Sequence, residues 1–177
     1  MVYSEYFNIE RQALDALRGA VKPFELQILS LITFGCPTAY YIYRKNLEVA
    51  SFALCVVQWN KYFDLEITQY PIERLRYIGK TLAPTILQKE IDCPDQEPIE
   101  DLLLKFRALN IPTLAKSSWG LDGTTMEVAF FLQTSQTEAR YSWWGDVPKE
   151  WKDLESLTQE AILLFRKQSH TKGWFYI

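Results

Sequence analysis

The sequence has one histidine, three cysteines and seven glycines among its 177 residues, and each scarcity excludes a class of site. A lone histidine, His170, cannot build a histidine metal centre, and no neighbouring group in its polar segment would hold the imidazole for catalysis. The glycines form neither a Gly-x-Gly-x-x-Gly pattern nor a Walker-type loop, so a backbone cradle for nucleotide phosphates is not expected. We therefore expect no catalytic site of a known motif, no metal and no cofactor.

The three cysteines, Cys36, Cys55 and Cys93, are odd in number, widely spaced and without a Cys-x-x-Cys pair. This usage is typical of a reducing compartment and predicts a cytoplasmic protein rather than a disulfide scaffold. The net charge of −3 gives no electrostatic basis for binding nucleic acid or an anionic membrane surface.

Long apolar runs are also scarce. The longest uncharged window, 26–43, has 18 residues, which is about the minimum for a membrane span. Gln27, Ser30 and Thr33 interrupt it, and Gly35-Cys36-Pro37-Thr38 is a turn signal in its middle. The window therefore predicts two buried strands joined by a tight turn, and no membrane-spanning segment.

What the sequence does contain is ample material for a core, with 48% apolar and 15% aromatic residues. Its length predicts a single domain over 1–177. The order of predicted elements is helix, four strands, two helices, two strands, helix. This order indicates an α+β fold with a mainly antiparallel sheet of about six strands and with helices packed on one face.

Periodicity sets the limits of these elements. Helical spacing predicts helices over 9–20, 71–82, 99–109 and from 148 onward, with Asn8 as the N-cap of the first. Alternation predicts strands over 24–34, 40–43, 49–59, 62–68, 125–132 and 141–144. The strand over 62–68 alternates most cleanly, after a hairpin turn at Asn60 and Lys61. Residues 49–59 favour a central strand buried on both faces, with a helix from Leu47 as the open alternative.

Two carboxylates in the predicted strand 62–68 could carry chemistry. Asp64 and Glu66 would share one face of that strand, and paired acids can serve acid–base or glycosidase reactions. The simpler interpretation is the solvated face of an edge strand, because exposed strand faces are normally polar.

A second acidic group runs from Glu90 to Asp101, where six carboxylates occur without a basic residue. The spacing does not match a calcium-binding loop. One interpretation is a solvated connection whose last acids favour a helix dipole. The other is an acidic patch that steers a basic partner towards the protein.

Tryptophans are unusually frequent in the C-terminal third. Because Trp143 and Trp144 are adjacent in a predicted strand, they must face opposite sides of the sheet. An exposed tryptophan could anchor a protein partner, whereas packing against the last helix through Trp151 accounts for most of the others. The predicted partner-binding residues are Asp92, Asp95, Glu97, Glu100, Asp101, Trp119 and Trp144.

The pattern Asp122-Gly123-Thr124, Glu127, Tyr141-x-Trp143-Trp144 and Pro148-x-x-Trp151-x-x-Leu154 carries a resemblance. It resembles the C-terminal signature of small uncharacterised bacterial α+β proteins, some of which are similar to immunity proteins of contact-dependent and polymorphic toxin systems. The resemblance implies a non-catalytic bacterial protein of the cytoplasm and supplies no site residues. It leaves the first two-thirds of the chain unmatched.

The sequence thus predicts a non-enzymatic, cytoplasmic protein-binding domain with a basic partner, of which an immunity-type inhibitor of a toxin or effector is the specific form. One alternative is a small carboxylate-dependent enzyme or sugar-binding protein using Asp64, Glu66 and Asp122. Another is a structural subunit that buries a large apolar surface in a homo-oligomer.

Overall fold

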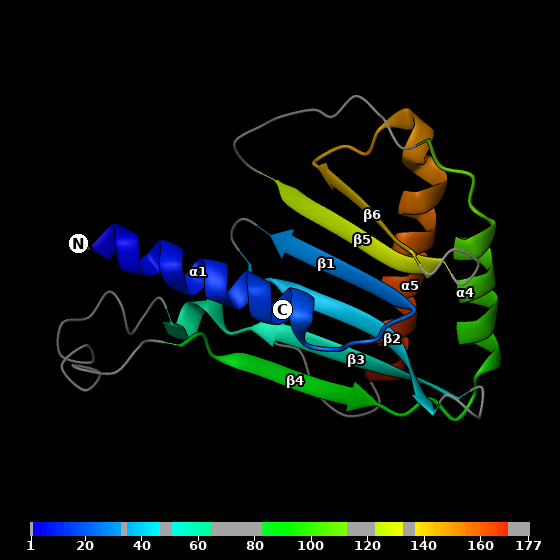
Figure 1. Ribbon diagram of the computed structural model, residues 1–177, viewed down its shortest axis with the longest axis horizontal. Helices are drawn as coiled ribbons and strands as arrows, with labels where there is room; N and C mark the ends of the chain where they lie inside the picture. Colours follow the sequence, from blue (N-terminus) through cyan, green and yellow to red (C-terminus); the bar gives the residue numbers. More distant parts are fainter. Residues whose placement is uncertain are drawn as a thin grey trace.

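The computed structural model describes residues 2–32, 35–46, 51–64, 83–112, 123–132 and 137–169, which build one open sheet with helices on both sides (Figure 1). The helical elements are α1 (Val2–Gly19), α4 (Glu97–Ala108), the short η1 (Lys149–Trp151) and α5 (Lys152–Ser169). The strands are β1 (Leu26–Ile32), β2 (Thr38–Asn46), β3 (Ser51–Trp59), β4 (Ile86–Ile91), β5 (Thr124–Leu132) and β6 (Thr137–Trp144). They follow the order β4-β3-β2-β1-β5-β6, and all neighbours are antiparallel. The predicted α+β class and six-stranded antiparallel sheet are confirmed.

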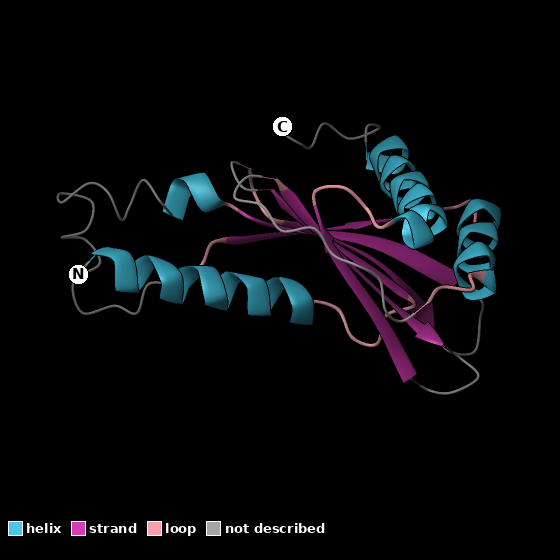
Figure 2. Ribbon diagram, turned by 90° about the horizontal axis from the view of Figure 1, so that it is seen from above, coloured by secondary structure: helices cyan, strands magenta, loops and turns pink. Residues whose placement is uncertain are grey.

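The helices form two layers rather than one. Figure 2 shows α1 on one side of the twisted sheet and the pair α4–α5 on the other. The expectation of one helix-covered face therefore holds for α4 and α5 but not for α1, which buries its stripe of Ile9, Ala13 and Leu17 on the opposite face. Both faces need a cover because the central strands carry apolar side chains on each of them.

Strand β3 shows this two-sided burial most clearly. Leu54 and Val56 belong to the core beneath α4 and α5, whereas Cys55 and Val57 belong to the core beneath α1. The strand predicted over 49–59 is confirmed over Ser51–Trp59, and the helix alternative is wrong. The predicted turn at 35–38 is also confirmed, since β1 and β2 form an antiparallel hairpin across it. No described helix is long and apolar enough to cross a membrane.

The C-terminal hairpin and helix agree with their predicted pattern. Tyr141 and Trp143 point from β6 into the helix layer, where both rings meet Trp151 edge-on at centroid distances of 5.3 and 6.5 Å. The indole Nε1 of Trp151 donates a 3.0 Å hydrogen bond to the carbonyl of Pro112. These contacts fix the start of α5 against both the sheet and the segment that follows α4.

The strand predicted over 62–68 is wrong where the structure describes it. Residues 61–64 form a single helical turn, and 65–82, with the predicted helix over 71–82, lie outside the described residues. The turn closes because the buried carboxylate of Asp64 accepts three hydrogen bonds: one from Trp59 Nε1 at 2.6 Å, and two from the backbone N and Oγ1 of Thr85 at 2.8 and 2.6 Å. These long-range donors override the local alternation.

Two further limits differ from the prediction. The sheet's fourth strand is β4, which no alternation predicts because it lies at a sheet edge and half of its side chains are exposed. Helix α1 begins at Val2, so Asn8 lies inside the helix and is not its N-cap.

The role assigned to Asp64 predicts a stability effect. Asp64→Ala removes the acceptor of the Trp59 indole and the Thr85 amide, and we expect it to lower the free energy of unfolding by about 3 kcal/mol. Asp15→Ala, which deletes a solvent-facing carboxylate of α1, should change it by less than about 0.5 kcal/mol. Urea unfolding of both variants measures the difference, and equal midpoints would show that Asp64 does not hold the turn.

Candidate interaction surface

The acidic residues predicted to bind a partner lie where strand β4 leads into helix α4. Asp92 and Asp95 occupy the connection, and the remaining three belong to α4 itself. All five are exposed. In Figure 1, α4 stands at the end of the sheet far from the N-terminus of α1.

Polar contacts to strand β3 fix the start of α4. The side chain of Gln96 accepts a 2.6 Å hydrogen bond from the backbone N of Phe52 and donates one of 3.2 Å to its carbonyl. Its amide also donates to the carbonyl of Cys93. Asp95 accepts from the backbone N of Glu97 at 3.3 Å and so satisfies one amide of the first helical turn. The acidic side chains are therefore presented by a helix whose position the sheet determines.

Four residues recur at helical spacing on the solvent side of α4: Glu97, Glu100, Asp101 and Leu104. Their spacing of three and four residues places them on one stripe, opposite the buried Ile99 and Leu103. Leu104 is 60% exposed, whereas the other large apolar residues of α4 are buried. We call these four residues the α4 stripe. A helical projection of the sequence would have shown Leu104 as the apolar residue on the polar side.

The charges near this stripe are only partly neutralised. Lys105 bridges Asp101 and Glu160 of α5, at 2.8 Å to each. Among the residues that the structure describes, no basic side chain forms an ion pair with Glu97 or Glu100. These two carboxylates lie in the first turn of α4, on the same stripe as the exposed leucine.

The other end of the acidic segment is neutralised by strand β2. Lys45 pairs with Glu90 and Asp92 at 2.5 Å each, and the Tyr43 hydroxyl donates to Glu90. The Lys45 ammonium, followed by the Tyr43 hydroxyl, lowers the pKa of Glu90 below its ordinary value. This part of the segment is tied to the sheet, and it contributes less charge to a partner than Glu97 and Glu100 do.

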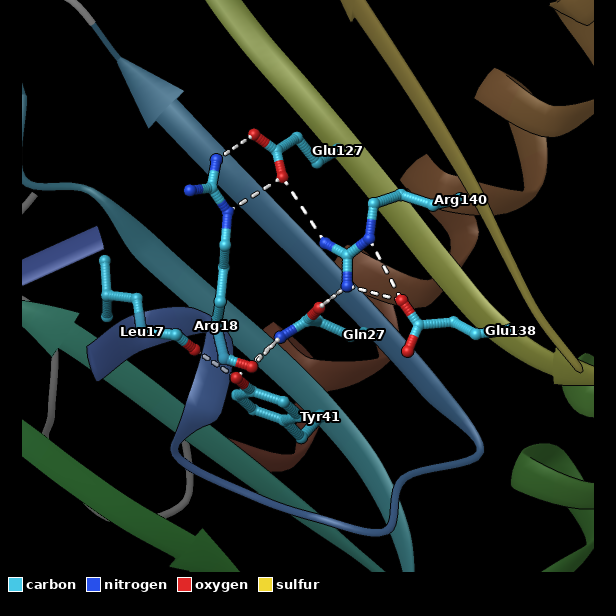
Figure 3. Close-up of polar contacts among 7 residues, drawn as sticks. All are labelled: Leu17, Arg18, Gln27, Tyr41, Glu127, Glu138 and Arg140. Atoms are coloured by element: carbon cyan, nitrogen blue, oxygen red, sulfur yellow. Dashed lines mark hydrogen bonds and ion pairs between the residues drawn. The ribbon is translucent and has the colours of Figure 1, made fainter. Parts of the chain in front are cut away.

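A second polar cluster lies on the opposite face, at the C-terminal end of α1 (Figure 3). Arg18 donates to both carboxylate oxygens of Glu127 on β5, at 2.6 and 3.2 Å. Arg140 on β6 pairs with Glu138 at 2.6 Å and extends over β5 to the side-chain oxygen of Gln27 at 3.3 Å. The register places Ala129 between Arg140 and Gln27, and its small side chain leaves room for the guanidinium.

This cluster satisfies the end of helix α1. The last carbonyls of a helix lack partners within it, and here Gln27 Nε2 donates to the carbonyl of Arg18 at 3.0 Å. The Tyr41 hydroxyl donates to the carbonyl of Leu17 and accepts from Gln27 at 2.6 Å. Gln27 and Tyr41 are fully buried, and burial raises the pKa of Tyr41 to about 12. The side chains in Figure 3 point towards one another and serve to attach α1.

Of the three groups proposed for carboxylate chemistry, Asp64 alone lies within the described residues. Asp64 is buried and already holds three donors, so the expected solvated face is wrong for it. Glu66, Asp122, Trp119 and His170 lie outside the described residues. Trp144 is half-buried, and its ring lies so close to Gly123 that a Cβ there would meet the indole at 2.9 Å.

Thiols and metal ligands give no further site within the described ranges. Burial raises the pKa of Cys55 to about 11 and also raises that of Cys93, which keeps both thiols protonated at neutral pH. Among the described residues, no three of His, Cys, Asp and Glu converge as a metal site would require.

The protein matches no family model, no curated protein and no solved structure.

The α1 attachment predicts a pH-dependent stability difference. Tyr41→Phe removes the hydroxyl that joins Leu17 and Gln27, and at neutral pH we expect a loss of about 1–2 kcal/mol in the free energy of unfolding. The unfolded phenol ionises near pH 10, whereas the folded one stays protonated until about pH 12. Its contribution is therefore complete below pH 10 and is lost as the pH rises towards 12.

Urea unfolding across this range should show wild type and Tyr41→Phe converging in stability. Tyr141→Phe is the matched control, because its ring contacts with Phe130 and Trp151 are kept. A constant difference between wild type and Tyr41→Phe up to pH 12 would contradict the assignment.

Proposed function

We propose that this protein is a non-enzymatic binding protein that recognises a basic surface of a protein partner through the α4 stripe. The observation that carries the proposal is the α4 stripe on a helix fixed to the sheet: Glu97 and Glu100, which form no ion pair within the described residues, and the 60% exposed Leu104. An apolar centre surrounded by a polar rim is the usual arrangement of a protein interface.

The two kinds of residue have different tasks in this mechanism. Glu97 and Glu100 attract a basic surface over several ångströms and mainly raise the association rate, an effect that salt screens. Leu104 fills a pocket of the partner and mainly slows dissociation. Because Gln96 already holds the start of α4, little ordering of the helix accompanies binding.

The partner class follows from the sequence resemblance rather than from the surface. The C-terminal pattern resembles that of small bacterial proteins, some of which are similar to immunity proteins, and this resemblance favours a toxin or effector domain, which the binding protein would inhibit by covering a basic functional surface. The alternative of a carboxylate-dependent enzyme or sugar-binding protein has less support. Asp64 belongs to its proposed site, and both oxygens of this carboxylate already accept hydrogen bonds within the fold.

Capture of partners from lysate of the native cell tests the proposal. The triple variant Glu97→Gln/Glu100→Gln/Leu104→Ala should bind the partner at least about tenfold more weakly than wild type, and its binding should depend less on salt. Glu150→Gln/Asp153→Asn is the control, since it removes two charges from the first turns of η1 and α5.

Circular dichroism should show that all variants fold. A stoichiometric partner held equally by wild type, the triple variant and the control at low and high salt would exclude the α4 stripe as the binding surface.

A further inference from the structure

Strand β6 is an outer strand of the sheet among the described residues, and the edge that it turns away from β5 has a defined pattern. Among the described strands it pairs only with β5. The hydrogen bond from Gly145 N to the carbonyl of Thr124 fixes which residues turn towards β5, because bonded and non-bonded pairs alternate along an antiparallel ladder. Ala139 and Tyr141 direct their backbone groups to β5. Glu138 and Arg140 direct theirs outwards.

The outward-bonding residues are also oppositely charged. Glu138 and Arg140 lie two residues apart on the same face of β6, each with 37% of its side chain exposed, and they pair at 2.6 Å. The Arg140 guanidinium also contacts Glu127 at 3.5 Å and Gln27 at 3.3 Å on the β5 side. An antiparallel copy of the strand, centred on Ala139, would place Glu138 opposite Arg140 of the copy and Arg140 opposite its Glu138. Charges of alternating sign would then occupy the four corners of a square.

We propose that two copies of this protein associate through their β6 edges, with Ala139 facing Ala139. In this register the outward N–H and C=O groups of Glu138 and Arg140 meet those of Arg140 and Glu138 in the second copy, as an antiparallel ladder requires. The two sheets join into one, and β4 becomes the outer strand at each end.

Neighbouring registers lack this complementarity. Centring the pair on Arg140 or on Glu138 places like charges directly opposite each other, which is unfavourable across strands. Centring it on Tyr141 pairs Arg140 with Ser142 and forms no ion pair.

The other edge of the sheet is not self-complementary. Side chains alternate along β4, so Glu90 is the only charged residue on one face and Lys89 the only one on the other. Two β4 strands could not match opposite charges across either face. We therefore assign the proposed association to the β6 edge. The α4 stripe, which lies on the layer of α4 and α5, takes no part in it.

Sedimentation of the full chain over a range of concentrations tests the association. Wild type should form a dimer, and Glu138→Arg, which sets an arginine opposite Arg140 of the second copy, should raise the dissociation constant at least about tenfold. Glu138→Gln, which removes attraction without adding repulsion, should fall between them. A monomer at every concentration, or a dimer that Glu138→Arg does not weaken, would overturn the proposal.

Cysteine cross-linking tests the register separately. Residues of a non-hydrogen-bonded pair have Cα atoms about 4.5 Å apart, within the range of a disulfide. In a Cys36→Ser background, Ala139→Cys should therefore oxidise to a covalent dimer, whereas Ser142→Cys on the same strand should not. Equal cross-linking at both positions, or none at Ala139→Cys from a dimeric protein, would refute the register.

Discussion

The side chain of Gln27 makes three hydrogen bonds at the centre of the sheet, and the placement of helix α1 depends on them. Its amide donates to the carbonyl of Arg18 and to the Tyr41 hydroxyl, and its oxygen accepts from Arg140. A buried amide without partners would be costly, so each of these groups requires the others. The result is a polar link that runs from β6 across β5 to β1 and β2 and ends at α1 (Figure 3).

Charged residues in the described chain have two different uses. Those on the sheet form ion pairs that join elements of the fold. Glu127 pairs with Arg18, and Glu25 pairs both with Arg44 of β2, at 2.6 Å, and with Arg107 of α4, at 2.9 Å. On α4, the carboxylates of Glu97 and Glu100 form no such ion pair with any other described element. This division is why the α4 stripe supports a binding role, whereas the hydrogen-bonded cluster at α1 supports a structural one.

Local pattern was sufficient to predict the elements that bury a continuous stripe or face, such as β3, α4, β5 and α5. It failed where distant residues decide the outcome. In the sequence, Asp64 is one polar position of an alternating pattern that predicts a strand. In the structure, its carboxylate accepts hydrogen bonds from Trp59 and Thr85, and the segment forms a helical turn instead. Gln27 reads as an ordinary polar position in β1, and its burial follows only from its cross-strand neighbours.

The candidate site was predictable in composition but not in detail. The sequence located the acids and the helix that carries half of them, because six carboxylates without a basic residue are conspicuous. It could not show that Lys45 neutralises Glu90 and Asp92, because that contact joins β2 to the far side of β3. Nor did the predicted tryptophan anchor identify Leu104, whose exposure depends on which side of α4 packs against the sheet.

The division between structural and binding charges is tested most directly by comparing partner capture by Glu100→Gln and Glu127→Gln. Both variants lose one carboxylate, one from the α4 stripe and one from the α1 cluster. We predict that Glu100→Gln weakens capture while its stability is nearly unchanged, and that Glu127→Gln loses stability but captures the partner as wild type does. If folded Glu127→Gln lost capture of the partner while Glu100→Gln captured it as wild type does, this division of roles would be wrong.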